Sequence, residues 1–178
     1  MADGYPLGVR PGLRLELQHP DFATEYFALV EANLERLARW EPWATVPQSV
    51  SGIRTYLAWQ AQAFVARTQL PFVIVLDGRA VGSCTARLDA TEGTAEIGYW
   101  VGATVEGTGV ASESIGALVA HVFARGDTFR VQARTAVENG RSRMLLDRLG
   151  FAFEGVQRSA QRMPGRRVDM AVYAKIAG

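Results

Sequence analysis

A short glycine turn, Glu-Gly-Thr-Gly at positions 106–109, is the first candidate for a functional site in this sequence. An apolar, strand-like run ends just before it at 94–101, and a helix-like apolar pattern begins just after it. The first N–H groups of a helix have no partner within the helix, and that helix end carries partial positive charge. Glycines let an anion approach those amides closely, so the turn predicts a site for a phosphate or pyrophosphate.

This glycine pattern is short, and it has a simpler interpretation. No third glycine follows Gly107 and Gly109 at the dinucleotide-binding spacing, and no Gly-Lys-Ser/Thr of a P-loop is present. A tight strand-to-helix connection that binds nothing would use the same glycines. The turn by itself therefore leaves both interpretations open.

Composition limits the other classes of function. The 178 residues are 48% apolar and 21% charged with a net charge of +1, as in an ordinary globular domain. We therefore expect neither nucleic acid nor a membrane as a partner, and no apolar run reaches the roughly 18 residues of a membrane span. The single cysteine, Cys84, excludes an intrachain disulfide, and His19 and His121 lack metal-ligand spacing, so no metal is expected. The N-terminus lacks a signal-peptide pattern, which favours a cytoplasmic protein.

Apolar periodicity predicts the strands and helices that surround the glycine turn. Strand patterns lie at 13–17, 71–76, 80–88, 94–101, 129–135, 151–158 and 167–176. Helical spacing covers 22–37, 50–64, 115–123 and 138–150. The order is one strand, two helices, three strands, helix, strand, helix and two strands. This order predicts an α/β (α+β) domain built on a mixed sheet of about seven strands with about four helices.

Five fragments follow one another along nearly the whole chain: WEPW (40–43), AEIGYW (95–100), EGTGVA (106–111), NGRSRMLLDRLGF (139–151) and EGVQR (154–158). In this order they resemble the GCN5-related N-acetyltransferases (the GNAT superfamily), and within them the Rim-type ribosomal-protein N-terminal acetyltransferases. The resemblance implies one GNAT-like domain with a mostly antiparallel sheet over residues 13–178, after an N-terminal extension at 1–12. The family's pyrophosphate loop reads Gln/Arg-x-x-Gly-x-Gly/Ala. Glu106 departs from its first position, where a carboxylate is unfavourable beside a pyrophosphate, and Thr108 stands where a basic residue is common.

The resemblance implies acetyl-CoA as the co-substrate. Its pantetheine would pair with the strand backbone as an added strand, and its pyrophosphate would lie on the amides of the turn. Asn139 could equally cap the helix that follows it, and Arg143 could simply be solvated. The residues expected to contact acetyl-CoA are Trp100, Val101, Gly107, Thr108, Gly109, Val110, Ala111, Ser112, Asn139 and Arg143.

Acyl transfer to an amine needs a group that takes the amine proton, and it gains from a donor near the leaving sulfur. Glu96 is the candidate base, because it lies on the strand expected to carry acetyl-CoA and related acetyltransferases place a glutamate there. The alternative interpretation is that Glu96 is a strand glutamate that is solvated or paired with an arginine. Ser142 is the candidate donor to the thiolate, as the serine of the N-x-x-S motif. Its alternative is an ordinary serine in the first turn of a helix.

Four further residues are candidates for binding the acceptor. Trp40 and Trp43 would line the acceptor site, as the matching segment of the family does, or they would form a hydrophobic plug. Tyr99 would lie near the thioester, although a strand tyrosine is more often a core residue. Asp169 would bind the acceptor amine or pair with a nearby arginine.

These observations predict an N-acetyltransferase that acts by direct attack in a ternary complex. The acceptor could be a protein N-terminal α-amine or a small-molecule amine, because a fold does not determine a substrate. Two alternatives stay open: a non-catalytic acyl-CoA-binding module, and an acyltransferase that uses a longer donor such as succinyl-CoA. A homodimer is also compatible with the resemblance.

Overall fold

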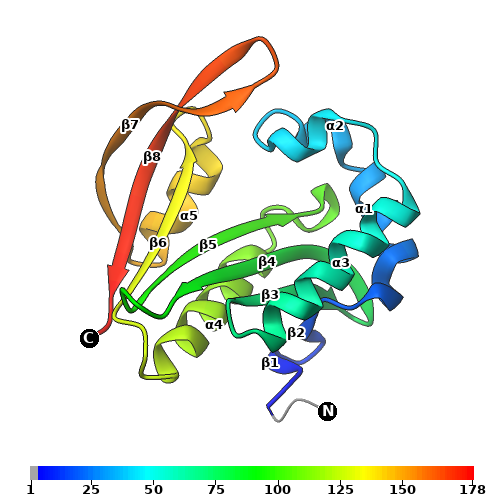
Figure 1. The fold of residues 1–178 in the computed structure, drawn as a ribbon, viewed down its shortest axis with the longest axis horizontal. Helices are drawn as coiled ribbons and strands as arrows, with labels where there is room; N and C mark the ends of the chain where they lie inside the picture. The colour runs from blue at the N-terminus through cyan, green and yellow to red at the C-terminus, as the bar shows by residue number, and fades with distance from the viewer. Residues whose placement is uncertain (1–3) are drawn as a thin grey trace.

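A mixed sheet of eight strands organises residues 4–178, which are the residues that the computed structural model describes (Figure 1). Its strand order is β1-β2-β3-β4-β5-β6-β8-β7. Only the β5–β6 pair is parallel, and all the other neighbours are antiparallel. The strands are β1 (Leu7–Arg10), β2 (Leu13–Leu17), β3 (Gln69–Leu76), β4 (Arg79–Asp89), β5 (Thr94–Val101), β6 (Arg130–Ala136), β7 (Ala152–Met163) and β8 (Arg166–Ile176).

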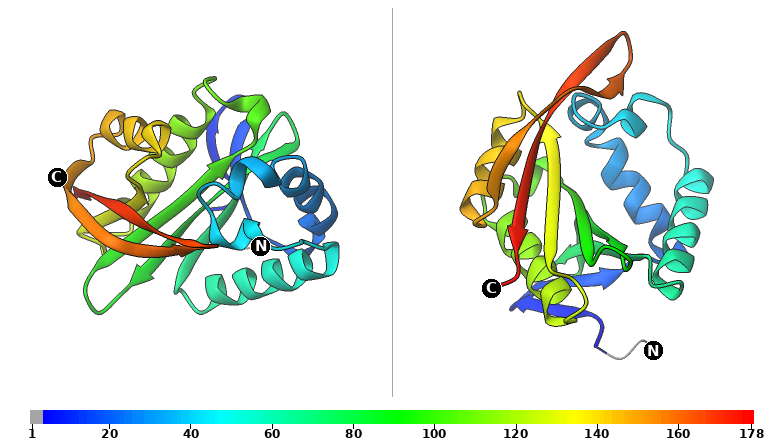
Figure 2. Two further views of the ribbon diagram at one scale, coloured as in Figure 1. Left: turned by 90° about the horizontal axis from the view of Figure 1, so that it is seen from above. Right: turned by 60° about the vertical axis from the view of Figure 1, so that its left-hand side comes forward.

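Helices cover both faces of this sheet (Figure 2). One face packs against α1 (Ala23–Glu31) and α3 (Val50–Val65), which bury a smaller cluster with Val73 and Val75. The other face packs against α4 (Val110–Ala124), and the main core lies there. The short α2 (Leu34–Leu37) follows α1, and α5 (Gly140–Arg148) follows β6. Among the described residues, no helix is both long and apolar enough to cross a membrane.

The mixed, mostly antiparallel sheet is confirmed, with one strand and one helix more than the sequence predicted. The added strand is β1, which pairs with β2 and lies within the segment interpreted as an N-terminal extension. The added helix arises because the helix predicted over 22–37 is interrupted at Asn33. Asn33 donates to the Leu29 carbonyl at 2.8 Å and accepts the Ala103 N–H at 2.9 Å. The interruption therefore joins the first helices to the segment that follows β5.

β5 and β6 separate partway along their length, which opens the sheet. Their parallel pairing runs from Thr94–Arg130 to Ile97–Ala133 and stops there, although both strands continue. The Gly102 N–H bonds to Val81 of β4 at 2.7 Å. Because the C=O and N–H of one peptide point in opposite directions, the Val101 carbonyl faces away from β4 and into the opening. The end of β5 thus has a backbone edge that β6 does not cover.

Candidate active site

The glycine turn lies beside this opening, where it begins α4. Gly107 and Gly109 have φ angles of 75° and 89°, a left-handed conformation that glycine adopts at little cost. Among the described residues, no hydrogen-bond acceptor contacts the backbone N–H groups of Gly107, Gly109, Val110, Ala111 and Ser112. A Cβ atom built on Gly107 would meet nothing within 4 Å. Five unpaired amides at a helix N-terminus in front of open space fit a pyrophosphate.

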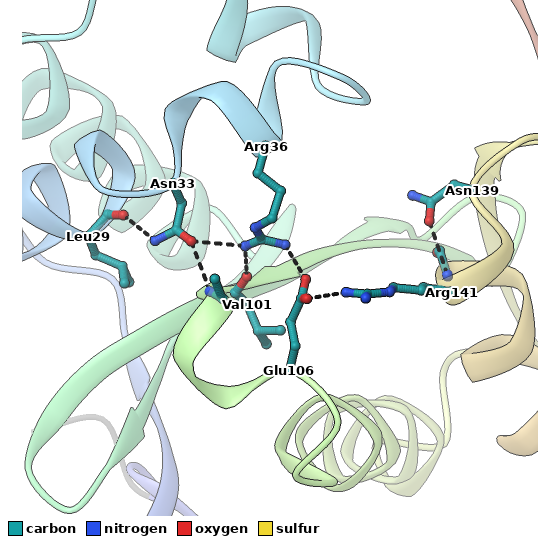
Figure 3. Close-up of polar contacts among 9 residues, drawn as sticks. Leu29, Asn33, Arg36, Val101, Glu106, Asn139 and Arg141 are labelled. Carbon is teal, nitrogen blue, oxygen red and sulfur yellow. Dashed lines mark hydrogen bonds and ion pairs between the residues drawn. The ribbon is translucent and has the colours of Figure 1, made fainter.

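Glu106, at the first position of the turn, lies between two arginines from distant helices (Figure 3). Its carboxylate forms ion pairs with Arg36 of α2 and Arg141 of α5. Arg36 also donates to the Val101 carbonyl, and to the Asn33 side chain at 3.1 Å. The carboxylate that the sequence placed unfavourably near a pyrophosphate is therefore neutralised by two guanidinium groups.

The same network occupies one of the backbone groups expected to pair with pantetheine. Arg36 donates to the Val101 carbonyl from its open side, so an added strand would share this acceptor with the guanidinium or displace it. Arg36 was not identified from the sequence, because 65 residues separate it from Val101. Thr108 turns its hydroxyl to the Val105 carbonyl at 2.7 Å and so closes the turn rather than extending from it.

Across the opening, Ser142 and Tyr99 are in direct contact. Their hydroxyl oxygens are 2.8 Å apart, which joins the first turn of α5 to β5. Burial raises the pKa of Tyr99 to about 12, so its hydroxyl keeps its proton at neutral pH. Asn139 accepts the Ser142 N–H at 3.2 Å and caps α5, as its alternative interpretation predicted. The pair places two hydroxyl groups at the edge where β5 leaves β6.

Arg143 faces the C-terminal strands. Its Nε donates to the Tyr173 hydroxyl at 3.1 Å, and its guanidinium lies 5.6 Å from the centre of the Phe153 ring. Of the two arginines in this turn of α5, it is Arg141 that reaches the glycine turn through Glu106. Spacing alone could not distinguish them, since both lie within one helical turn.

Glu96 lies on β5 in the arginine-paired arrangement that was its alternative interpretation. Its Oε1 accepts from Arg87 at 2.6 Å and from Arg134 at 3.1 Å. Within the part of the chain that the structure describes, its Oε2 accepts a single long bond, 3.3 Å, from Gln132 on β6. Glu96 is thus anchored at one oxygen and has capacity for a further proton donor at the other.

Comparisons with known proteins agree with this geometry. The family model described as acetyltransferase (GNAT) domain matches residues 14–152. The chain belongs to the GNAT acetyltransferase family. It is 28% identical over 169 residues, 93% of this chain and 92% of the relative, to YdaF of Bacillus subtilis (strain 168), which is named as a ribosomal N-acetyltransferase. The prediction of an N-acetyltransferase enzyme is confirmed at the level of the family.

Solved structures show the same fold as this GNAT acetyltransferase. A ribosomal L7/L12 alpha-N-protein acetyltransferase, RimL, solved with coenzyme A has a TM-score of 0.93 at 24% identity, with 96% of this chain and 97% of that chain covered. The microcin C7 self-immunity acetyltransferase MccE, solved with acetyl-CoA and AMP, has a TM-score of 0.91 at 24% identity, with 95% and 94% covered. At these identities the likeness establishes the fold.

The remaining candidates of this GNAT acetyltransferase lie near Trp100 of β5 or on the β7–β8 hairpin. Trp43 lies 6.2 Å from Trp100, measured between ring centres, and is 37% exposed. Trp40 packs against a buried cluster of the β7–β8 hairpin, and its carbonyl accepts from Gln161 at 2.8 Å. Asp169 accepts the Ser159 N–H at 2.7 Å and thereby holds an irregular stretch of that hairpin. Trp43 therefore lies beside Trp100 at the end of β5, Trp40 packs on the hairpin, and one oxygen of Asp169 is used within the hairpin.

Proposed function

We propose that this GNAT acetyltransferase transfers an acetyl group from acetyl-CoA to a primary amine by direct attack in a ternary complex. The observation that carries the proposal is the row of five unpaired amides, from Gly107 to Ser112, beside the uncovered end of β5. A helix N-terminus and an open strand edge together suit a ligand with a pyrophosphate and an amide-bearing chain. Acetyl-CoA supplies an activated acetyl thioester to this site.

The chain's own residues can support each proton transfer. The amine nitrogen attacks the thioester carbonyl carbon, the carbon–sulfur bond breaks, and the thiolate takes a proton. Glu96 Oε2 has capacity to accept the amine proton, directly or through water, while the arginines hold Oε1 in place. The Tyr99–Ser142 hydroxyl pair can donate to the sulfur as negative charge develops on it.

For the acceptor, we propose the N-terminal α-amine of a protein, with a small-molecule amine as the alternative. The names of YdaF and RimL support the first, and MccE, which was solved in complex with acetyl-CoA and AMP, supports the alternative. An α-amine has a pKa near ~7.8, so it needs less help from Glu96 than a side-chain amine with a pKa near ~10.4.

Calorimetric titration with acetyl-CoA tests the donor, with CoA and succinyl-CoA as comparisons. We expect a dissociation constant on the order of micromolar for acetyl-CoA. No binding of any acyl-CoA would remove the basis of the proposal. Binding without acetylation of any amine in a panel of peptides and small amines would favour the non-catalytic module.

The Glu96→Gln variant tests the base in the same assay. We expect kcat to fall by about 10²-fold because a general base is lost, while the Kd of acetyl-CoA stays the same. The loss should be larger for a side-chain amine than for an α-amine. An unchanged kcat for both amines would mean that Glu96 only anchors Arg87 and Arg134.

A further inference from the structure

Two arginines from different strands meet at one oxygen of Glu96. Arg87 of β4 donates to Oε1 at 2.6 Å, and Arg134 of β6 donates to the same oxygen at 3.2 Å through Nε and at 3.1 Å through Nη2. Glu96 pairs with Arg87 across β4 and β5 and with Gln132 across β5 and β6, so the three side chains face the same side of the sheet. Arg134 is two residues beyond Gln132 and faces that side as well. We name Arg87, Glu96 and Arg134 the Arg–Glu–Arg cluster.

The Arg–Glu–Arg cluster carries more positive than negative charge. Two guanidinium groups and one carboxylate leave one positive charge in excess. Within residues 4–178, neither arginine pairs with another carboxylate, and Nε and Nη1 of Arg87 and Nη1 of Arg134 have no protein acceptor. The cluster therefore has both the charge and the N–H donors for one further anion.

This imbalance of charge is uncommon in the molecule. Among the ion pairs of the described residues, Glu96 and Glu106 are the two carboxylates that pair with two arginines, and each of the others has one basic partner. Arg14 and Glu16 on β2, for example, form a one-to-one pair at 2.5 Å. Glu106 lies at the turn where the phosphates are expected to bind, so the excess charge at Glu96 suggests a second anion, beside the proposed base.

The cluster is accessible, and it lies where the sheet opens. The side chains of Arg87 and Arg134 are 60% and 38% exposed. Gly98 and Arg134 each follow the Ile97–Ala133 pair, the last pair between β5 and β6, so both lie where the two strands begin to separate. Gly98 faces the same side as Glu96, and a Cβ atom on Gly98 would meet nothing within 4 Å. A ligand can therefore contact the guanidinium groups and lie over Gly98 at the same time.

The excess charge discriminates between acceptors. At neutral pH an amine approaches mostly as an ammonium, because its pKa is near ~7.8 for an α-amine and ~10.4 for a side-chain amine. The net positive charge of the cluster repels a simple ammonium ion. An acceptor with its own carboxylate is neutral overall and supplies the missing anion, which guanidinium groups bind through paired N–H donors.

We propose that Arg87 and Arg134 bind a carboxylate of the acceptor, while the amine to be acetylated lies over Gly98 near Oε2 of Glu96. The inference rests on the proposed function and narrows its substrate class to amines that carry a carboxylate. Neighbouring strands are about 4.8 Å apart and alternate residues about 7 Å, so the two groups would be roughly 5–7 Å apart, which about four or five bonds span. An aspartate near a peptide N-terminus can supply this carboxylate, and so can a small amino acid.

Matched acceptors test the proposal and separate these two sources. One pair is a tetrapeptide with aspartate or asparagine at its second position, and the other is 4-aminobutanoate and 4-aminobutanamide. Within each pair the reacting amine is of the same kind, and the negative charge is what differs. We expect wild type to prefer the carboxylate member of at least one pair by about tenfold in kcat/KM. That pair identifies the source of the carboxylate.

Arg87→Gln and Arg134→Gln should each reduce this preference to about threefold or less without changing the Kd of acetyl-CoA. The preference is the informative quantity, because a loss of support for Glu96 would slow both members of a pair alike. Arg14→Gln is the matched control, since Arg14 is also a strand arginine paired with a glutamate and is 39% exposed, against 38% for Arg134. The high exposure of Arg87 means that Arg87→Gln keeps the test available if Arg134→Gln does not fold.

The outcomes distinguish this inference from the proposed function. Acetylation without a preference for the carboxylate member, or a preference that the two cluster variants keep or that Arg14→Gln lowers equally, overturns the inference but not the acetyltransferase. If no amine is acetylated, calorimetry of the same pairs against the CoA-loaded protein decides, because binding does not require turnover. Tighter binding of the carboxylate member that is lost in Arg87→Gln or Arg134→Gln supports the cluster, and equal binding means that the two arginines serve only to hold Glu96.

Discussion

The site has a donor side, proposed to bind acetyl-CoA at the glycine turn, and an acceptor side, proposed to bind the amine near Glu96. The two sides differ in how their polar groups are paired. On the donor side, side-chain charges are already paired. Glu106 forms ion pairs with Arg36 and Arg141, and Arg36 donates a hydrogen bond to the Val101 carbonyl. On the acceptor side, arginines pair with Oε1 of Glu96, whereas within residues 4–178 Oε2 accepts a single long bond from Gln132. The donor side therefore has charges whose pairing changes when a phosphate binds, whereas the acceptor side keeps one carboxylate oxygen with capacity for a proton donor.

This difference suggests how binding on each side should respond to mutation. Ion pairs that are partly exposed contribute little stability and weaken with salt, so removing Glu106 should alter donor affinity more than folding. Backbone amides cannot be removed by a side-chain change, so only the glycines that expose them can be altered. The strongest test of the donor side is therefore directed at the turn itself.

Gly107→Ala should have the largest effect on the donor side. A Cβ atom on Gly107 projects into the open space before the amides, and it raises the cost of the left-handed backbone by about 1–2 kcal/mol. We expect the Kd of acetyl-CoA to rise about 30-fold or more, measured by calorimetry. Gly126→Ala is the control, since Gly126 has nearly the same φ, 76° against 75°, and also has open space around it, in the turn after α4. Equal losses of affinity in both variants would attribute the effect to destabilisation rather than to the amides.

Ser142→Ala should have the next largest effect, and on turnover rather than binding. It removes the partner of the Tyr99 hydroxyl and, under the proposed function, one donor to the sulfur, so we expect kcat to fall about tenfold with little change in the Kd of acetyl-CoA. Ser114→Ala is the control, because Ser114 is a buried serine of α4 whose hydroxyl has no partner among the described residues. A kcat that stays at the wild-type value in both variants would restrict Ser142 to the packing of α5 against β5.

Most of the sheet could be predicted because its inner strands have continuous or alternating apolar runs, as in β3 and β4. The edge strand β1 has only two apolar residues in its alternation, Leu7 and Val9, which is too short a signal. The interruption at Asn33 was missed because helical spacing continues through Val30, Leu34 and Leu37. The fact that Asn33 is buried, which explains the interruption, depends on contacts with a segment 70 residues away.

The site was predicted unevenly for the same physical reason. A glycine turn before a helix is a local pattern, and it indicated the free amides directly. The partners of Glu106 come from α2 and α5, so the sequence suggested a repulsive carboxylate where the fold pairs it twice. The direction of a side chain within one helical turn, as for Arg141 and Arg143, also follows from packing and not from spacing.

Glu106→Gln should have the smallest effect on acetyl-CoA binding, and it should tighten that binding rather than weaken it. We expect the phosphates of acetyl-CoA to compete with this carboxylate for Arg36 and Arg141, so its neutralisation should tighten acetyl-CoA binding by about three- to fivefold at low salt. The gain should shrink as ionic strength rises, which calorimetry at two salt concentrations measures.

Glu113→Gln separates competition for the arginines from a general loss of negative charge. Glu113 lies in the first turn of α4 but pairs with Arg10, at 2.5 Å, outside the Glu106 network. A similar gain in both variants would mean that charge near the helix N-terminus is sufficient. Weaker binding in Glu106→Gln alone would reverse the comparison, because Glu106 would then hold the two arginines in place for the phosphates. In that case the donor side, like the acceptor side, would be arranged in advance of its ligand.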